Sequence, residues 1–402
     1  MGEIGTASEY DVLIANTLWE NSEVTWRSSS VNWGSITWQR ARNTTSIAEV
    51  TIPGVAIGLG DCGVLSNLKA WDRAIWILRD GVRVWDGLVT GWKTTGGDLT
   101  ITARDRSSMF AKRLVGVDRD FTDTDLYEVV AGLLVNCGLV TYVEDPVSPS
   151  NPFYLTVTPN YLDDPSSLVI TREYRVARLD KIDKVIAELV DTAGLEWSIL
   201  NSEMRLSAKG LWSGNDSFGY AVLDPVLNER TIVGGVLDVT VDGSAVATQM
   251  YVGSDSAGPS GFANRTNVNN GTYSDIALQE GIPESQINPG DSPARAAFVN
   301  GAKLATPDVT LEKVQLSPRF GSRSFPSDLT WLVPGVIYPI DFPDSCALNI
   351  PIVTMNQFDY EMTAESATVD HVRLDQLDVK VERHDDGSLS ETFLGSFTAV
   401  AI

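Results

Sequence analysis

The sequence predicts a mainly β protein in which a smaller part made of helices and strands interrupts the strand-rich sequence. Three observations support this prediction: tryptophan-rich alternating segments near the N-terminus, amphipathic helical patterns between about 120 and 200, and renewed strand patterns after about 235. The chain has 402 residues, 43% of them hydrophobic. That is enough for roughly two to four domains with packed cores.

Short strands separated by tight turns are expected in the first 110 residues. Eight of the eleven tryptophans lie there, among many Val, Ile and Thr residues, and these residue types favour strands. The pairs Asp80-Gly81 and Gly96-Gly97 each stand between alternating segments and supply the positive φ of a tight hairpin turn. An antiparallel meander, typical of a barrel or a sandwich, is therefore predicted.

Three helices of appreciable length are predicted, near 123–137, 178–193 and 291–304. The first two carry apolar residues at helical spacing and are followed by Gly138 and Gly194, residues that commonly end helices. Aspartate, serine or threonine stands before the apolar stripe of the first and third helices, where it can cap the helix N-terminus.

Beyond the second helix, the strand patterns return with an Asp242-Gly243 hairpin signal. The Gly-, Ser- and Asn-rich stretch 253–274 is predicted to be an exposed loop. The polar end of the chain, 376–402, has the composition of an arm or a tail.

The net charge of −23 is unevenly distributed along the chain. Residues 1–115 hold 12 acidic and 12 basic residues, 116–342 hold 30 and 15, and 343–402 hold 11 and 3. Such an acidic chain is a poor ligand for phosphates, so stable nucleic-acid binding is excluded. An acidic surface repels DNA, which matters where DNA must slide past it.

No apolar run is long enough for a membrane span, and the N-terminus has no secretion signal, so we expect folding in a cytosol. The three cysteines are scattered and are expected to be buried free thiols, and two histidines are few for metal or triad chemistry.

One glycine pattern resembles a dinucleotide-binding fingerprint: Gly58-x-Gly60-x-x-Gly63, with Asp80 about twenty residues on. The fingerprint needs a strand before it, a long helix after it and continued strand–helix alternation. Here Pro53 shortens the preceding strand and a hairpin follows. Turns between strands are therefore the preferred interpretation.

An acidic cluster could suggest calcium: Asp118, Asp120, Asp123 and Asp125. It lacks the twelve-residue loop with a central Gly and a closing Glu, so helix capping is the better explanation. No catalytic, cofactor-binding or metal-binding residue is predicted, and no cofactor.

The segment 77–115 carries motifs in a recognisable order: Arg79-Asp80-Gly81, Trp85-Asp86-Gly87, Ala103-Arg104-Asp105 and Arg113. It resembles the N-terminal barrel of siphophage tail-hub and minor tail proteins, especially those of actinobacteriophages. Downstream, "AGLEWSI", "AVATQMYVG" and a Leu-x-Pro-Gly motif follow in the family's order, over roughly 350 residues. Where relatives continue Pro-Gly-Asp, this chain has Val336.

The resemblance implies tail-tube-like β-barrels with smaller inserted domains. We expect a tube-like barrel at 1–115, an inserted helix-and-strand domain at 116–234, a second barrel region at 235–375 and an arm or tail at 376–402. It further implies a structural, non-enzymatic tail-tip protein that forms a homotrimeric ring in the virion. Such a ring closes or lines the DNA channel and contacts the distal tail protein, the tape measure protein, and fibre or tip proteins.

Two other functions stay open from the residues alone. The tryptophans could form a stacking surface in a carbohydrate- or receptor-binding tail module. Two of the 53 acidic residues could serve a cell-wall or polysaccharide hydrolase, although no pair of carboxylates is marked by its spacing.

Overall fold

The computed structural model describes most of the chain. The described residues are 9–20, 23–54, 68–137, 139, 156–159, 169–193, 195–200, 203–208, 226–234, 237–244, 249–253, 262–267, 279–283, 308–317, 329, 332–342, 348, 352–356, 361–365 and 369–400.

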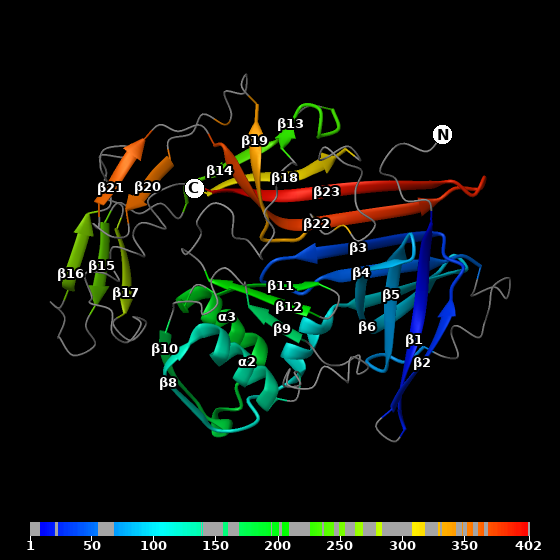
Figure 1. Ribbon diagram of the computed structural model, residues 1–402, viewed down its shortest axis with the longest axis horizontal. Coiled ribbons are helices and arrows are strands. Elements are labelled where there is room, and N and C mark those ends of the chain that lie inside the picture. Colours follow the sequence, from blue (N-terminus) through cyan, green and yellow to red (C-terminus); the bar gives the residue numbers. More distant parts are fainter. Residues whose placement is uncertain are drawn as a thin grey trace.

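A 13-stranded sheet organises the molecule (Figure 1). Eleven strands follow one another in the order β14-β18-β23-β22-β3-β4-β7-β6-β5-β1-β2. The remaining two strands are β19, which pairs with β22, and β13, which pairs with β19. The strands of its N-terminal half are β1 (Tyr10–Glu20), β2 (Glu23–Ser30), β3 (Ser35–Ala41), β4 (Ile47–Ile52), β5 (Arg73–Arg79), β6 (Val82–Thr95) and β7 (Asp98–Arg104). Those of its C-terminal half are β13 (Leu227–Asn228), β14 (Val239–Asp242), β18 (Asp308–Leu316), β19 (Ile337–Asp341), β22 (His371–Arg383) and β23 (Leu389–Val400). The prediction of a mainly β protein is confirmed.

The hairpins expected near the N-terminus are present. Asp80 and Gly81 have φ values of 49° and 79° and join β5 to β6, while Gly96 and Gly97, at 62° and 103°, join β6 to β7. Positive φ at both central residues matches the right-handed twist of the paired strands, which explains why Asp-Gly and Gly-Gly stand there.

Among the described strands, one strand pair joins the first and last thirds of the chain. β3 pairs antiparallel with β22, from Ser35 opposite Glu382 to Ala41 opposite Gln376. Arg40 of β3 is buried and reaches across the core, donating to the carbonyl oxygens of Leu329, Leu332 and Val84 at 2.8–3.1 Å. The two halves of the sheet therefore fold as one unit.

The sheet is curved so that strands far apart in its order share one core. Buried side chains from both halves form this core, among them Ile36, Trp38, Val50, Ile75, Ile77, Val84, Leu311, Val372, Leu374, Val379, Phe393 and Phe397. Arg79 at the end of β5 forms a doubly bonded ion pair with Glu391 of β23, at 2.9 and 3.3 Å. Both side chains are about 2% exposed or less.

The C-terminal end of the chain differs from the expected arm or tail. Residues 376–402 instead supply most of β22 and β23, which pair along twelve register positions from His371 opposite Val400 to Arg383 opposite Leu389. In β23, buried Phe393 and Phe397 alternate with less buried residues, so a polar, Gly- and Ser-containing composition hid a two-residue periodicity that places one face in the core.

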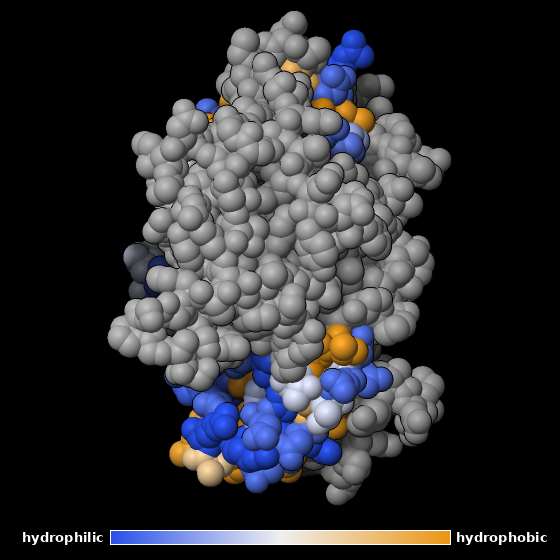
Figure 2. Space-filling view, turned by 90° about the vertical axis from the view of Figure 1, so that its left-hand side faces the viewer, coloured by the Kyte–Doolittle hydropathy of each residue, from blue (hydrophilic) through white to orange (hydrophobic). Residues whose placement is uncertain are grey.

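A second core lies beneath the sheet in the helical part of the molecule (Figure 1). Its elements are β8 (Arg119–Asp125), α2 (Leu126–Asn136), β9 (Thr156–Pro159), β10 (Val169–Tyr174), α3 (Ile182–Ala193), β11 (Leu195–Leu200) and β12 (Glu203–Ala208), with 3-10 turns at Arg106–Lys112 and Val176–Arg178. Figure 2 shows hydrophilic side chains predominating on the outside of this part, at the bottom of the view.

The two middle helices are confirmed and begin later than predicted. Asp125 caps α2 by accepting from the Tyr127 N–H at 2.9 Å, so the helix starts at Leu126. Leu179 has φ of 53°, outside the helical region, and α3 starts only at Ile182. The predicted helix at 291–304 lies outside the described residues.

Two smaller sheets complete the described strands: β15 (Gln249–Gly253), β16 (Phe262–Asn267) and β17 (Gln279–Pro283), and β20 (Ile352–Asn356) with β21 (Glu361–Glu365). The Asp242-Gly243 hairpin prediction is wrong, because β14 pairs with β18 while β15 pairs with β16 and β17. The predicted loop 253–274 contains β16.

Among the described strands the large sheet does not close on itself, since β14 and β2 at its ends do not pair. The two-barrel organisation and the borders at 115, 234 and 375 stay predictions.

We expect Glu391→Gln to lower the free energy of unfolding by about 3 kcal/mol, because the change keeps the shape of the side chain and removes the carboxylate charge of a buried ion pair with Arg79. Urea unfolding followed by tryptophan fluorescence measures this loss. The matched control is Glu382→Gln: that side chain is 47% exposed beside Lys380, and its loss should be below about 1 kcal/mol. Equal losses of unfolding free energy in the two variants would contradict a stabilising role for the buried ion pair between Arg79 and Glu391.

Candidate functional site

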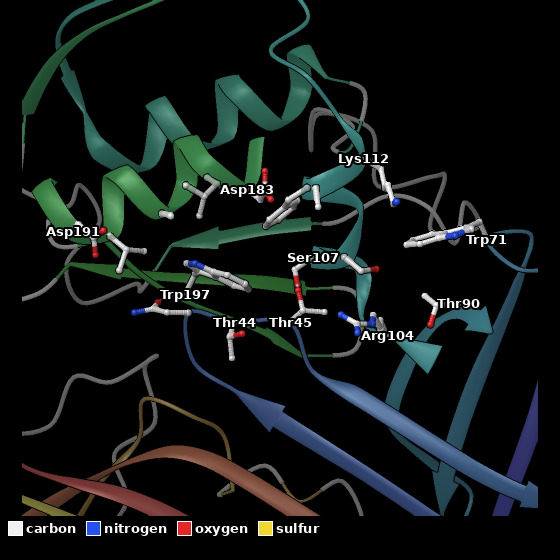
Figure 3. Close-up of a pocket in the computed structure, with 17 residues that line it drawn as sticks. Thr44, Thr45, Trp71, Thr90, Arg104, Ser107, Lys112, Asp183, Asp191 and Trp197 are labelled. Atoms are coloured by element: carbon white, nitrogen blue, oxygen red, sulfur yellow. Dashed lines mark hydrogen bonds between the residues drawn. The ribbon is translucent and has the colours of Figure 1, made fainter. Parts of the chain in front are cut away.

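A cleft of about 590 Å³ separates the large sheet from the helical part (Figure 3). The loop after β3, the end of β7, the 3-10 turn Arg106–Lys112, helix α3 and strand β11 supply its walls. Its lining combines aromatic, hydroxyl and charged side chains, including Trp71, Trp197, Phe110, Thr44, Thr45, Thr90, Ser107, Arg104, Lys112, Asp183 and Asp191. Its volume lies within the range of about 300–1,000 Å³ that is common for small-molecule sites.

Asp105 fixes the wall formed by the 3-10 turn. Its carboxylate accepts from the N–H of Ser46 at 2.7 Å, and from the N–H and hydroxyl of Ser107 at 2.9 and 2.6 Å. Ser107 in turn lies 2.8 Å from the hydroxyl of Thr45. The acid therefore caps the turn and joins it to the loop after β3, which sets the position of two hydroxyl groups in the cleft.

Two hydrogen bonds between Asn43 and Trp197 attach the opposite wall to the sheet. The Asn43 N–H donates to the Trp197 carbonyl at 2.8 Å, and the Trp197 N–H donates back to Asn43 Oδ1 at 2.8 Å. Asn43 has φ of 56°, a conformation that asparagine adopts more readily than most residues. Trp197 also meets Phe110 edge to face at 5.8 Å between ring centroids.

A charge cluster lies beside this attachment. The Glu196 side chain is fully buried and accepts from Arg42 at 2.8 Å and from Arg373 at 3.1 Å. Arg42 also bonds Asp375 of β22 at 2.6 Å. One carboxylate of the helical part is thereby held by arginines from the first and last thirds of the chain.

Trp71, Lys112, Thr90 and Arg104 gather at one end of the cleft, and Asp191 lies at the other (Figure 3). The Lys112 ammonium lies 5.4 Å from the centroid of the Trp71 ring. Trp71 itself has φ of 66°, which is unusual for a bulky residue, and its N–H donates to the Val89 carbonyl at 2.7 Å. The sequence shows the abundance of tryptophans, but nothing in it singles out Trp71.

Three of the other N-terminal tryptophans belong to the core. Trp33, Trp38 and Trp85 are at most 3% exposed. Trp92 is 41% exposed on β6, outside this cleft. Trp33, Trp38 and Trp85 are therefore not available to a stacking surface.

The family-like motifs mostly serve structure. Arg79 pairs with Glu391, Asp86 pairs with Arg106 at 3.1 Å, and Asp105 caps the 3-10 turn. In the Leu-x-Pro-Gly motif, Gly335 has φ of 101° and its N–H donates to Leu374 at 2.7 Å. Arg104, and Trp197 of the "AGLEWSI" motif, line the cleft.

The four clustered aspartates do not converge on one point. Asp118 accepts from the Val176 N–H at 2.7 Å, Asp120 pairs with Arg175, and Asp125 caps α2. Across the described ranges, no group of three or more His, Cys, Asp or Glu side chains is arranged to hold a metal ion. The Gly58-x-Gly60-x-x-Gly63 pattern lies outside the described residues.

Comparisons with known proteins identify the fold. No family model matches the sequence, and no curated protein matches it. The structure is similar to the 43 kDa tail protein of prophage MuSo2 from Shewanella oneidensis, with a TM-score of 0.57, 9% identity, and 97% of this chain and 96% of that chain covered. A tail protein from Neisseria meningitidis MC58 gives a TM-score of 0.54 at 11% identity, covering 96% of each chain.

The prophage tail protein gp18 from Listeria monocytogenes EGD-e gives a TM-score of 0.53 at 8% identity, covering 96% of this chain and 94% of that chain. The chain thus has the fold of phage tail proteins along nearly its whole length. Within the described part of the chain, no helix is long and apolar enough to cross a membrane.

Burial raises the pKa of the Asp105 carboxyl to about 6, although its hydrogen bonds to Ser107 and Ser46 act in the opposite direction. Because the pKa of this carboxyl is higher in the folded protein than in the unfolded chain, where it is near 4, protonation stabilises the folded state. The stabilisation is complete below about pH 4 and is lost as the pH rises through 6. A shift of about two pKa units corresponds to about 3 kcal/mol.

The comparison of wild type with Asp105→Asn isolates this effect, because all other titrating groups are shared. We expect the free energy of unfolding of wild type, relative to the variant, to fall by up to about 3 kcal/mol between pH 4 and pH 7. Denaturant unfolding across that range measures it. A difference that is constant or rises with pH would contradict the raised pKa.

Proposed function

We propose that this chain is a structural tail-tip protein, a baseplate hub, of a bacteriophage with a long non-contractile tail. The observation that carries the proposal is the end-to-end similarity of fold to three phage tail proteins, each covered over at least 94% of its length. The motif order of the segment 77–115 and of the later segments supports the hub assignment within the tail.

In this proposal three copies form a ring that closes or lines the DNA channel, with two related barrels per chain giving pseudo-sixfold symmetry. The sharing of one sheet by the first and last thirds, through β3 and β22, is compatible with such a compact ring subunit. The ring would contact the distal tail protein above, the tape measure protein, and fibre or tip proteins below. It would be made in the host cytoplasm and act in the virion.

Charge supports a role beside moving DNA. The duplex is a polyanion that binds basic surfaces strongly through counterion release, so a basic wall would retain it. Residues 116–342 carry a net charge of −15 and 343–402 a net charge of −8. We propose that these segments supply the acidic channel wall, while the neutral 1–115 supplies much of the subunit contact, where like charges would repel.

We propose no catalytic role. The buried carboxylates of Asp86, Glu196 and Glu391 each pair with at least one arginine, and that of Asp105 accepts from backbone and hydroxyl donors. These contacts are those of structural carboxylates, whose charges are needed to neutralise buried cations or cap a turn.

Cryo-EM of the intact virion tests the proposal. We expect a C3-symmetric ring of this chain at the tail tip, with more Asp and Glu than Lys and Arg on the channel wall. A ring position occupied by another gene product, or a wall dominated by basic residues, would refute it. Gold-labelled antibody against the chain provides an independent check, since the label should appear at the tip and not along the tube.

A further inference from the structure

We propose that the cleft between the large sheet and the helical part binds a saccharide that carries an anionic group, with Trp71 as the stacking surface and Arg104 and Lys112 as the anion-binding side chains. This inference rests on the lining of the cleft and not on the proposed hub function. It assigns a ligand to a region that would otherwise be only a junction between two cores.

The first argument is uncompensated positive charge. Arg104 and Lys112 are exposed at the same end of the cleft, and no ion pair joins either to a carboxylate among the described residues. By contrast, several arginines elsewhere in the described chain are paired: Arg42, Arg73, Arg79, Arg83, Arg106, Arg172, Arg175, Arg205 and Arg373. In a chain of net charge −23, two cations at one end of the cleft that no ion pair in the described part of the chain engages favour an anionic group in the ligand.

The second argument is the conformation of Trp71. A bulky residue with φ of 66° is sterically disfavoured, and such residues concentrate at binding sites, where the surrounding structure holds them. Here the hydrogen bond from the Trp71 N–H to the Val89 carbonyl holds the backbone, and the indole lines the cleft. Its ring already faces a cation, Lys112. The negative face of the ring also attracts the weakly positive C–H groups of a sugar. The long, exposed lysine side chain can move aside and pair with the anionic group of the ligand.

The third argument concerns the remaining lining. Thr44, Thr45 and Ser107 place hydroxyl groups along the middle of the cleft, Asp183 adds a carboxylate above the middle, and Asp191 adds one at the other end (Figure 3). Hydroxyls and carboxylates accept hydrogen bonds from sugar hydroxyls. Because the carboxylates would repel a long polyanion, the cleft suits a short saccharide with its anionic group at the Arg104 end, and does not suit nucleic acid.

An acidic peptide from another protein is the competing occupant. It would satisfy the cations, but it offers few hydroxyl donors for Asp183 and Asp191 and no flat C–H face for Trp71. The combination of an aromatic ring, several hydroxyls and both signs of charge therefore favours the saccharide.

The test uses the purified full chain and titration calorimetry supported by saturation-transfer NMR. Two probes distinguish the anionic group: trigalacturonic acid carries carboxylates, and maltotriose phosphate carries a phosphate. We expect saturable binding of at least one, and at least about tenfold weaker binding of its neutral counterpart. No saturable binding of either probe, or equal affinity for triglutamate peptide, would overturn the proposal.

Two variants tie binding to the cleft. Arg104→Gln should weaken binding at least about tenfold, while Arg230→Gln, which removes the same charge from an exposed turn outside the cleft, should leave it unchanged. Trp71→Gly removes the ring at a backbone conformation that glycine adopts freely, so it should unfold at no lower denaturant concentration than Trp71→Ala. It should nevertheless lose saturable binding. Wild-type affinity in Arg104→Gln or in Trp71→Gly would refute the site.

Discussion

The structure depends on one buried carboxylate that forms ion pairs with two arginines from distant parts of the chain. Glu196 belongs to the helical part, yet its partners Arg42 and Arg373 lie 154 and 177 positions away, in the first and last thirds of the chain. Burying a carboxylate without a positively charged partner is strongly unfavourable. Burying the guanidinium groups of Arg42 and Arg373 without a negatively charged partner is unfavourable for the same reason. All three groups are accommodated only when the helical part, β3 and β22 meet, so this cluster couples the two cores.

That coupling also determines the cleft. The paired bonds between Asn43 and Trp197 lie next to Glu196 in sequence and fix the distance between the loop after β3 and strand β11. Asp105 fixes the facing 3-10 turn through Ser46 and Ser107. The cleft is thus bounded by elements that hydrogen bonds and ion pairs position, and its lining is presented in a fixed arrangement suited to a binding site. A structural hub and a ligand-binding cleft are compatible roles for one such fold.

Local features were predictable from the sequence, whereas long-range features were not. Asp80-Gly81, Gly96-Gly97 and the stripes of α2 and α3 are signals within a few residues, and the structure confirms them. The pairing of Arg79 with Glu391 spans 312 positions, and no local pattern specifies it. The last strand, β23, was missed because its sequence is polar and then rich in Gly, Ser and Thr. In the cleft, Trp71 is selected by its backbone conformation, which a sequence does not display.

The most direct test of the coupling is hydrogen exchange of Glu196→Gln, which keeps the side-chain shape and removes its charge. The amides of β11 and α3 should lose protection, with those of β5 and β6 unchanged, because the helical part would open away from the sheet. Glu188→Gln is the matched control, since that residue on α3 is 47% exposed beside Arg172. Unchanged protection of β11 in Glu196→Gln, or equal loss in both variants, would contradict the account.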